Sequence, residues 1–135
     1  MGQSQSGYLI GYEDVQQGQN DGVTTIINTL SQSSQACLIA GTVEACDEEK
    51  VINVLLKKCR DSKIIIYGAN SVDVSPEKKK KQLDGLGFTR VFVYTGGLFE
   101  WLLLQEVYGM SNFATTAEEL DILKLALGQE VRWLL

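Results

Sequence analysis

The thiols are the first candidates for chemistry, because the chain has three cysteines and no histidine among its 135 residues. Without histidine, Ser–His and Cys–His catalytic pairs and histidine metal sites are excluded. Cys37, Cys46 and Cys59 form neither a C-x-x-C pair nor a zinc-ligand spacing. Only Cys46 precedes the start of a predicted helix, where the positive helix end can activate a thiol. We expect no metal and no cofactor, with Cys46 as the one candidate nucleophile among the cysteines.

A second candidate for chemistry is the loop that joins an apolar run, Lys63–Tyr67, to a helix predicted to start at Ser75 and Pro76. In open parallel sheets, ligands bind at the carboxyl ends of the strands, and backbone amides at a helix start attract anions. This loop contains no sulfur, and its last residue is acidic, so we expect it to bind anions weakly. Its residues are Gly68, Ala69, Asn70, Ser71, Val72 and Asp73.

The elements that would position this loop alternate between strands and helices. Apolar or β-branched runs predict strands, and 3.6-residue periodicity with turn residues at the ends predicts helices. Such an alternation is typical of an α/β fold with a mostly parallel central sheet and helices on both faces. The predicted strands are 8–10, 23–30, 37–43, 63–67 and 90–94; a weak helical turn at 13–19 is followed by a polar loop at 31–35 and helices at 47–59, 75–86 and 98–108.

Two of the helices carry capping signals. Asp47 and Ser75 are predicted to cap their helices through their side chains. The first of these helices is predicted to turn one apolar face inward. The residues of that face are Val51, Val54 and Leu55, with the stem of Lys58 at the rim.

The two ends of the chain differ from its centre. Residues 1–7 carry no apolar pattern and are predicted to be a flexible tail, whereas 8–113 form the domain. Residues 114–135 are predicted to be a partly helical extension that packs on the domain or on a partner. Its apolar end makes Trp133, Leu134 and Leu135 candidate partner-binding residues. The sequence Met-Gly-Gln-Ser-Gln-Ser makes Gly2 a candidate for N-myristoylation.

The order of several segments resembles that of a rhodanese-like (thiosulfate sulfurtransferase-like) domain over residues 8–113. The most specific part is Leu-x-x-Leu-Gly-Phe, followed by a strand, Gly-Gly and a tryptophan. The segments are Ile26-Ile27-Asn28, Ile39-Ala40-Gly41-Thr42-Val43, Lys63-Ile64-Ile65-Ile66-Tyr67, Leu83-Asp84-Gly85-Leu86-Gly87-Phe88, and Val91-Phe92-Val93-Tyr94-Thr95-Gly96-Gly97 with Trp101.

The resemblance implies where an active member would carry its chemistry. In active members the residue after the central strand is the cysteine that carries the persulfide, and a basic residue commonly closes the loop. The matching positions here hold Gly68 and Asp73, and Asn28 stands where an aspartate is usual. The loss of the cysteine also argues against the tyrosine-phosphatase-like members of this fold.

We therefore expect a catalytically inactive rhodanese-like module that acts as a structural or protein-interaction component of a larger assembly. Two alternatives stay open: a sulfurtransferase that uses Cys46, and a myristoylated adaptor with weak membrane-surface contact. The net charge of −5 argues against nucleic acid as a partner. No run approaches the ~18 apolar residues of a membrane span. Free thiols indicate the cytoplasm or another reducing intracellular compartment, including a cytoskeletal or ciliary assembly or a membrane surface.

Overall fold

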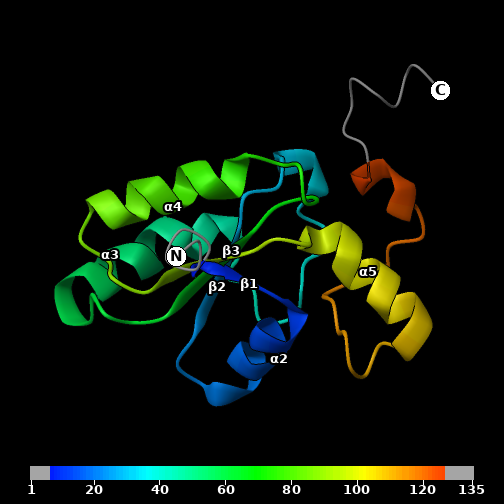
Figure 1. Ribbon diagram of the computed structural model, residues 1–135, viewed down its shortest axis with the longest axis horizontal. Helices are drawn as coiled ribbons and strands as arrows, with labels where there is room; N and C mark the ends of the chain where they lie inside the picture. Colours follow the sequence, from blue (N-terminus) through cyan, green and yellow to red (C-terminus); the bar gives the residue numbers. More distant parts are fainter. Residues whose placement is uncertain (1–6, 127–135) are drawn as a thin grey trace.

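The computed structural model describes residues 7–126, and within them four parallel strands form one sheet in the order β1-β4-β3-β2 (Figure 1). The central strand, β3, pairs in register with both neighbours, so that Ile65 lies opposite Ile26 on one side and Phe92 on the other. Every residue of β3 is fully buried, as its continuous apolar sequence predicted. The strands are β1 (Leu9–Ile10), β2 (Thr25–Asn28), β3 (Ile64–Tyr67) and β4 (Val91–Tyr94).

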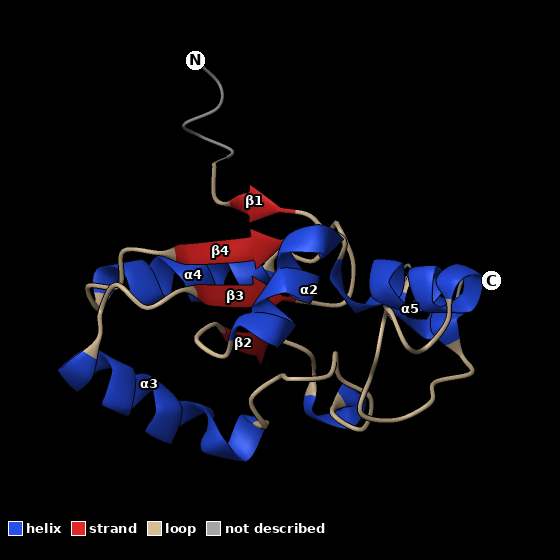
Figure 2. Ribbon diagram, turned by 90° about the horizontal axis from the view of Figure 1, so that it is seen from below, coloured by secondary structure: helices blue, strands red, loops and turns tan. Residues whose placement is uncertain are grey.

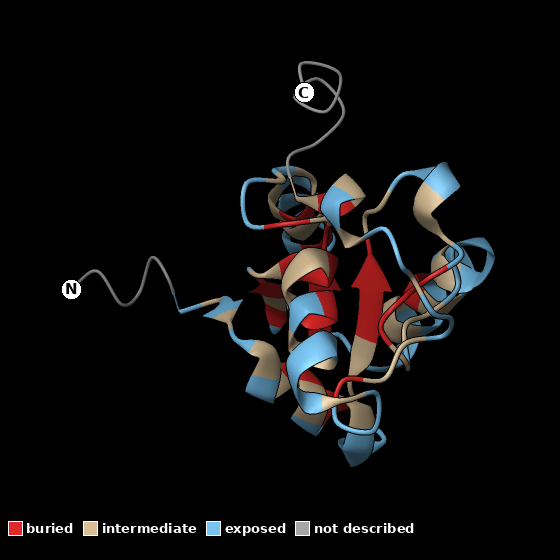
Figure 3. Ribbon diagram, turned by 90° about the vertical axis from the view of Figure 1, so that its right-hand side faces the viewer, coloured by how far each residue is buried: buried red, intermediate tan, exposed pale blue. Residues whose placement is uncertain are grey.

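Helices cover both faces of this sheet, which confirms the expected α/β architecture (Figures 1 and 2). Residues of α2 and α5 pack on one face, and residues of α3 and α4 pack on the other. Figure 3 shows the strands buried in the middle of the molecule, with exposed residues on the outer sides of the helices. The helices are α2 (Tyr12–Asp21), α3 (Glu48–Lys58), α4 (Ser75–Gly85) and α5 (Gly97–Tyr108); the short 3-10 helices are η1 (Gln32–Ser34), η2 (Ala45–Asp47) and η3 (Ile122–Leu125).

An aromatic cluster anchors α5 to the first of these faces. Trp101 is fully buried, and its ring meets Tyr94 and Phe113 edge-on at centroid distances of 6.1 and 5.1 Å. Its indole N–H donates to the carbonyl of Ala114 at 3.1 Å, which satisfies its polar atom inside the core. The start of the C-terminal extension is thereby held against α5.

The predicted strand at 37–43 is wrong. Only Ile39 and Thr42 make isolated bridges, to Thr115 and Ile26, and the Thr42 N–H turns back to the Ile39 carbonyl at 3.0 Å. Gly41 adopts a left-handed φ of +95°, which interrupts an extended chain. The apolar run therefore reflects a buried loop, and periodicity alone does not separate the two cases.

The inward face of α3 is rotated by one residue from the prediction. Ile52 is buried and Leu55 and Leu56 pack around it, whereas Val54 is 47% exposed. The sequence offers two overlapping apolar stripes, and the one with the larger side chains is buried because it removes more apolar area from water.

The predicted side-chain caps are also wrong, since neither Asp47 nor Ser75 makes a capping hydrogen bond as an N-cap residue. The residues of η2 lead directly into α3, and Ser75 is itself the first residue of α4. The weak turn predicted near residue 13 is the complete helix α2, which ends at Gly22 with φ +75°. The predicted polar loop at 31–35 contains η1.

The Gly97 backbone should tolerate no side chain. Its φ is +68°, and an added Cβ would lie 2.7 Å from the Gly68 carbonyl oxygen and 2.8 Å from the Asn70 nitrogen. We expect Gly97→Ala to lower the free energy of unfolding by about 2 kcal/mol or more in urea titrations. Gly85→Ala is the matched control, because nothing lies within 4 Å of its added Cβ. Equal stability of the two variants would contradict this packing.

The buried Tyr67 side chain predicts a loss of stability at alkaline pH. Its hydroxyl accepts the Ile39 N–H at 3.1 Å and lies 2.8 Å from Thr42 Oγ1, and burial raises its pKa to about 12. Its stabilising effect is complete below the unfolded pKa of about 10, and between about pH 10 and 12 the free energy of unfolding should fall by about 2–3 kcal/mol. In urea unfolding across this pH range, the free energy of unfolding of Tyr67→Phe should fall less steeply with pH than that of the parent. Identical pH slopes for the two proteins would argue against a contribution from Tyr67 ionisation.

Candidate functional site

The loop that follows β3 lies at the carboxyl ends of the strands. It runs from Gly68, which is buried, to Val74, which directly precedes the first residue of α4. Thr29 follows β2 beside it, and its N–H donates to the Tyr67 carbonyl at 3.0 Å. The turn at Gly97 after β4 meets it from the other side. This is the place where a parallel sheet positions ligand-binding groups.

The carboxylate of Asp73 points into this loop and ties both of its ends together. One oxygen, Oδ2, accepts the Ala69 N–H at 2.9 Å. The other, Oδ1, accepts the Ser75 N–H at 2.9 Å and the Ser75 hydroxyl at 2.7 Å. The carboxylate thus stands where a bound anion would meet the loop amides and the start of α4. The sequence predicted that this charge would repel anions from the loop; the structure places it in the loop as an internal acceptor.

Two further loop amides also have acceptors within the chain. Asn70 is buried, and its side-chain oxygen accepts the Val72 N–H at 3.0 Å while its carbonyl accepts the Asp73 N–H at 3.3 Å. Together with the Ala69 and Ser75 amides, four backbone donors of this segment are satisfied internally. These four donors are therefore already engaged and do not await an incoming anion.

The Asp73 carboxylate occupies the space that a side chain at position 68 would need. A Cβ at this position would overlap Asp73 Oδ2 and would lie 2.8 Å from Cγ of Pro76. A cysteine side chain and the inward Asp73 carboxylate therefore cannot both occupy the loop as it stands. The two departures noted in the sequence, at Gly68 and at Asp73, are sterically coupled.

The start of α5 fixes the loop from the opposite side. The N–H groups of Leu98 and Phe99 donate to the carbonyls of Gly68 and Ala69, each at 2.9 Å. These bonds satisfy donors that a helix start otherwise leaves without partners. These two hydrogen bonds require the backbone of Gly97 to lie against the loop.

The C-terminal extension packs beside the same loop. The Asn70 side-chain amide donates to the Leu125 carbonyl at 2.6 Å, and the Leu125 side chain is buried. A pocket of about 640 Å³ remains between this extension, the loop and the segment after β2. Lys124, at its edge, is already paired with Glu119 at 2.6 Å, and this pairing lowers the pKa of Glu119. The lining residues are Thr29, Leu30, Ser31, Ser33, Ser34, Ala69, Asp73, Ser75, Lys124 and Leu125.

None of the cysteines lines this pocket. Cys37 is buried and its thiol donates to the Ala117 carbonyl at 3.2 Å; burial raises its pKa. Cys59 follows α3 and donates to the Asp61 carboxylate at 3.1 Å, which raises the pKa of its thiol. Cys46 lies in η2 with its sulfur 3.8 Å from a Glu44 oxygen.

Two polar contacts near the loop carried no functional prediction from the sequence. Asn28 is buried and exchanges hydrogen bonds with the side chain of Gln35, at 2.7 and 3.2 Å. Tyr94 donates its hydroxyl to Glu100 at 2.6 Å, and burial followed by this bond raises the Tyr94 pKa far above its usual value. The Asp-x-Ser spacing before Pro76 could have indicated the inward Asp73, because aspartate commonly accepts the amide two residues on.

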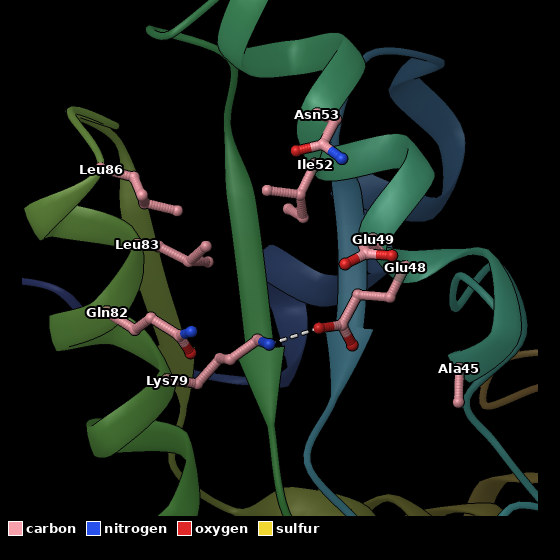
Figure 4. Close-up of a pocket in the computed structure, with 9 residues that line it drawn as sticks. All are labelled: Ala45, Glu48, Glu49, Ile52, Asn53, Lys79, Gln82, Leu83 and Leu86. Carbon is pink, nitrogen blue, oxygen red and sulfur yellow. Dashed lines mark ion pairs between the residues drawn. The ribbon is translucent and has the colours of Figure 1, made fainter.

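Two other features of the described residues hold no comparable arrangement. A hollow of about 370 Å³ lies between α3 and α4, where Lys79 pairs with Glu48 beside the apolar residues Ile52, Leu83 and Leu86 (Figure 4). A group formed by Glu44, Cys46 and Asp47 brings its potential ligand atoms within 4.8 Å of one another, but all three are exposed. Exposed acidic groups of this kind are common without a metal ion.

Comparison with known proteins identifies the family. The sequence profile described as "Rhodanese-like domain" matches residues 13–104, which is most of the chain. The chain therefore belongs to the rhodanese-like domain family, as its segment order indicated. No curated protein sequence matches it significantly.

Solved structures with low sequence identity share the fold. The Alr3790 protein from Anabaena sp. is 19% identical, with a TM-score of 0.57 over 87% of this chain and 86% of that one. The BH2092 protein from Bacillus halodurans is 16% identical, with a TM-score of 0.59 over 93% of each chain. A full-length protein from Lactobacillus plantarum is 14% identical, with a TM-score of 0.59 over 76% of this chain and 87% of that one. At these identities the likeness concerns the fold alone.

Several residues singled out in the sequence lie outside the described part of the chain. They are Gly2, Trp133, Leu134 and Leu135. Within residues 7–126, no helix has the length and apolar character needed to cross a bilayer.

Loss of the Asp73 carboxylate should destabilise the domain. Asp73→Ala leaves the Ala69 and Ser75 amides without their acceptor, and we expect about 1–3 kcal/mol less stability in urea unfolding. Asp84→Ala is the control, since it removes only a surface ion pair with Lys80 and should cost about 0.5 kcal/mol. Equal effects of the two substitutions would show that the loop does not depend on Asp73.

Proposed function

We propose that this rhodanese-like domain is non-catalytic and works by binding other proteins of a larger assembly. The observation that carries the proposal is the inward carboxylate of Asp73. Sulfur transfer needs a thiolate surrounded by the loop amides, and here a carboxylate bonds to those amides instead. The residue at the cysteine position, Gly68, has no room for a side chain beside it.

The cysteines elsewhere in the chain do not supply a replacement site. Cys37 is enclosed, and Cys59 donates its hydrogen to a carboxylate. Cys46 is exposed, but Glu44 and Asp47 surround it with negative charge. An anionic sulfur donor such as thiosulfate would meet repulsion at that position. The geometry therefore favours the binding module over a sulfurtransferase that uses Cys46.

The outer surface supports a role in protein contacts. Large apolar side chains are exposed on α5 and on the segments that follow it, and such groups mark contact surfaces more often than isolated exposed residues do. The exposed members in this region are Leu103, Val107, Tyr108, Met110, Leu120 and Leu123. The acylation of Gly2, weak membrane contact and a reducing intracellular location remain proposals that rest on the sequence.

A sulfurtransferase assay tests the proposed absence of catalysis. We expect no thiocyanate from thiosulfate and cyanide above the rate of the protein-free control, because the loop offers no thiolate. Cys46→Ala should be indistinguishable from the parent. Turnover that disappears in Cys46→Ala, with Cys59→Ala unaffected, would show that the chain is an enzyme with a displaced nucleophile.

A double-mutant cycle tests the steric link between Gly68 and Asp73. Gly68→Cys alone should be strongly destabilised, because its Cβ overlaps Asp73 Oδ2. In Gly68→Cys with Asp73→Gly the overlap with the carboxylate is gone and only the close approach to Pro76 Cγ stays, so the double variant should be more stable than the sum of the two single effects predicts. We expect a coupling of about 1–3 kcal/mol in urea unfolding, as for residues in direct contact. Additive effects would contradict the proposed exclusion of the cysteine.

A further inference from the structure

The helix α5 carries apolar residues on both its inner and its outer side. Leu98, Trp101 and Leu102 are buried against the sheet and the aromatic cluster. Leu103 and Val107 lie four residues apart, and therefore on one face, and within the described part of the chain they are 43% and 71% exposed. A helix that is apolar all round is normally buried all round. The outer side of α5, formed by Leu103 and Val107, therefore has the character of a contact surface.

The neighbouring η3 exposes a further leucine next to α5. It contacts α5, and the two lie together on one side of the molecule (Figure 1). Leu123 is 73% exposed, whereas Leu125 of the same turn is buried. The Asn70 side chain donates to the Leu125 carbonyl at 2.6 Å and so fixes η3 beside the helix. The exposed apolar groups thus stand on two elements that hold each other in place.

The part of the chain that forms this side of the molecule is acidic. Residues 91–126, which contain α5 and η3, hold five acidic residues and one basic residue. That basic residue, Lys124, is already paired with Glu119 at 2.6 Å. Glu106 lies exposed on α5 next to Val107, and no ion pair among the described residues includes it. The helix α2, which packs on the same face of the sheet, adds three acidic residues and no basic one.

The positive charges lie on the other side of the sheet. Residues 44–90 include all of α3 and α4, and they hold ten basic and eight acidic residues. The negative net charge of the protein therefore comes from the side that carries α2 and α5. A negative potential around an apolar surface attracts a positively charged partner and repels nucleic acids and anionic membranes. The charge distribution thus indicates a basic protein partner.

The geometry favours a partner that is itself a helix. The Leu98 and Phe99 amides at the start of α5 donate to the loop carbonyls, and later amides of a helix bond within it, so that recognition has to use side chains. Leu103 and Val107 have the spacing at which the side-chain ridges of one helix pack into the grooves of another. An amphipathic helix can also carry basic residues beside its apolar stripe.

We propose that the outer face of α5 binds a basic amphipathic helix of another protein, with the apolar stripe of that helix on Leu103 and Val107 and its lysines or arginines beside Glu106. This inference rests on the proposed function, because it names the kind of partner that the binding module takes. Apolar burial supplies the attraction between the two helices, and the opposite charges select the partner and speed its association.

Three model peptides test both parts of this recognition against the full-length protein. Each is about 18 residues long, or about five helical turns. The first has leucine at i, i+3, i+4 and i+7 and lysine elsewhere; the second has glutamate in place of lysine; the third has serine in place of leucine. In fluorescence anisotropy titrations we expect the Leu/Lys peptide to bind at least about tenfold more tightly than either of the others. Added salt should weaken its binding, because it screens the charges.

Substitutions on α5 locate the binding site. Leu103→Gln combined with Val107→Gln removes the apolar pair at exposed positions and should weaken binding of the Leu/Lys peptide about tenfold, as for central contact residues. Val23→Gln is the matched control, because Val23 is also 71% exposed and precedes β2. Binding to this variant should equal that of the parent. Far-UV circular dichroism and urea unfolding confirm that each variant is folded.

A second pair of variants tests the charge. Glu106→Lys should weaken binding of the Leu/Lys peptide several-fold and reduce its dependence on salt. Glu49→Lys makes the same change of charge at an exposed position of α3, on the other face of the sheet, and should have little effect. Equal weakening by these two variants would show that only the net charge of the protein matters, which would contradict a site on α5.

Other results would also overturn the proposal. Equal affinity for the Leu/Lys and Leu/Glu peptides would rule out selection of a basic partner, and binding that survives the α5 substitutions would place the site elsewhere. Self-association in sedimentation velocity that the double glutamine variant abolishes would assign the face to a second copy. The absence of binding by all three peptides would refute this partner class alone, whereas thiosulfate turnover that depends on Cys46 would refute the proposed function itself.

Discussion

The carboxylate of Asp73 is the contact on which the arrangement of the β3–α4 loop depends. It accepts hydrogen bonds from the first amide after Gly68 and from the first residue of α4, and so holds the two ends of the loop at a fixed separation. Backbone amides that converge on one point need a negatively charged or polar acceptor there. The chain supplies that acceptor from its own side chain, which makes the loop geometry independent of any bound anion.

The use of the Asp73 carboxylate as acceptor for the loop amides, in place of a bound anion, has consequences for neighbouring residues. Gly68 must lack a side chain, because the carboxylate occupies the adjacent space. Ser75 donates to the carboxylate rather than capping the helix, and its hydroxyl lies 2.7 Å from that of Thr29, after β2. The loop carbonyls are bound by the amides of Leu98 and Phe99 at the start of α5. With these bonds the loop is tied to two strands and two helices.

The C-terminal extension adds a second constraint on the same region. The family profile ends at residue 104, and the chain beyond it returns to the loop through the bond between Asn70 and Leu125. That bond buries the Asn70 side chain, which in turn provides the acceptor for the Val72 amide. The loop and the extension therefore stabilise each other, and α5 contacts both, with one side in the core and one side exposed. An assembly role would use surfaces around α5 rather than the loop itself.

The sequence by itself determined the parallel α/β architecture, the central position of Ile64–Tyr67 and the absence of sulfur from the loop. Each of these rests on local information: a continuous apolar run, the alternation of elements, or the identity of one residue. Tertiary structure alone decided that residues 37–43 form a buried loop, that Ile52 rather than Val54 faces inward, and that Asp73 points into the loop. Those outcomes depend on which of several locally equivalent conformations gives the better burial and satisfies the most backbone amides. Which conformation is adopted depends on the neighbouring strands, helices and extension. The spacing of residues along the chain therefore does not predict it.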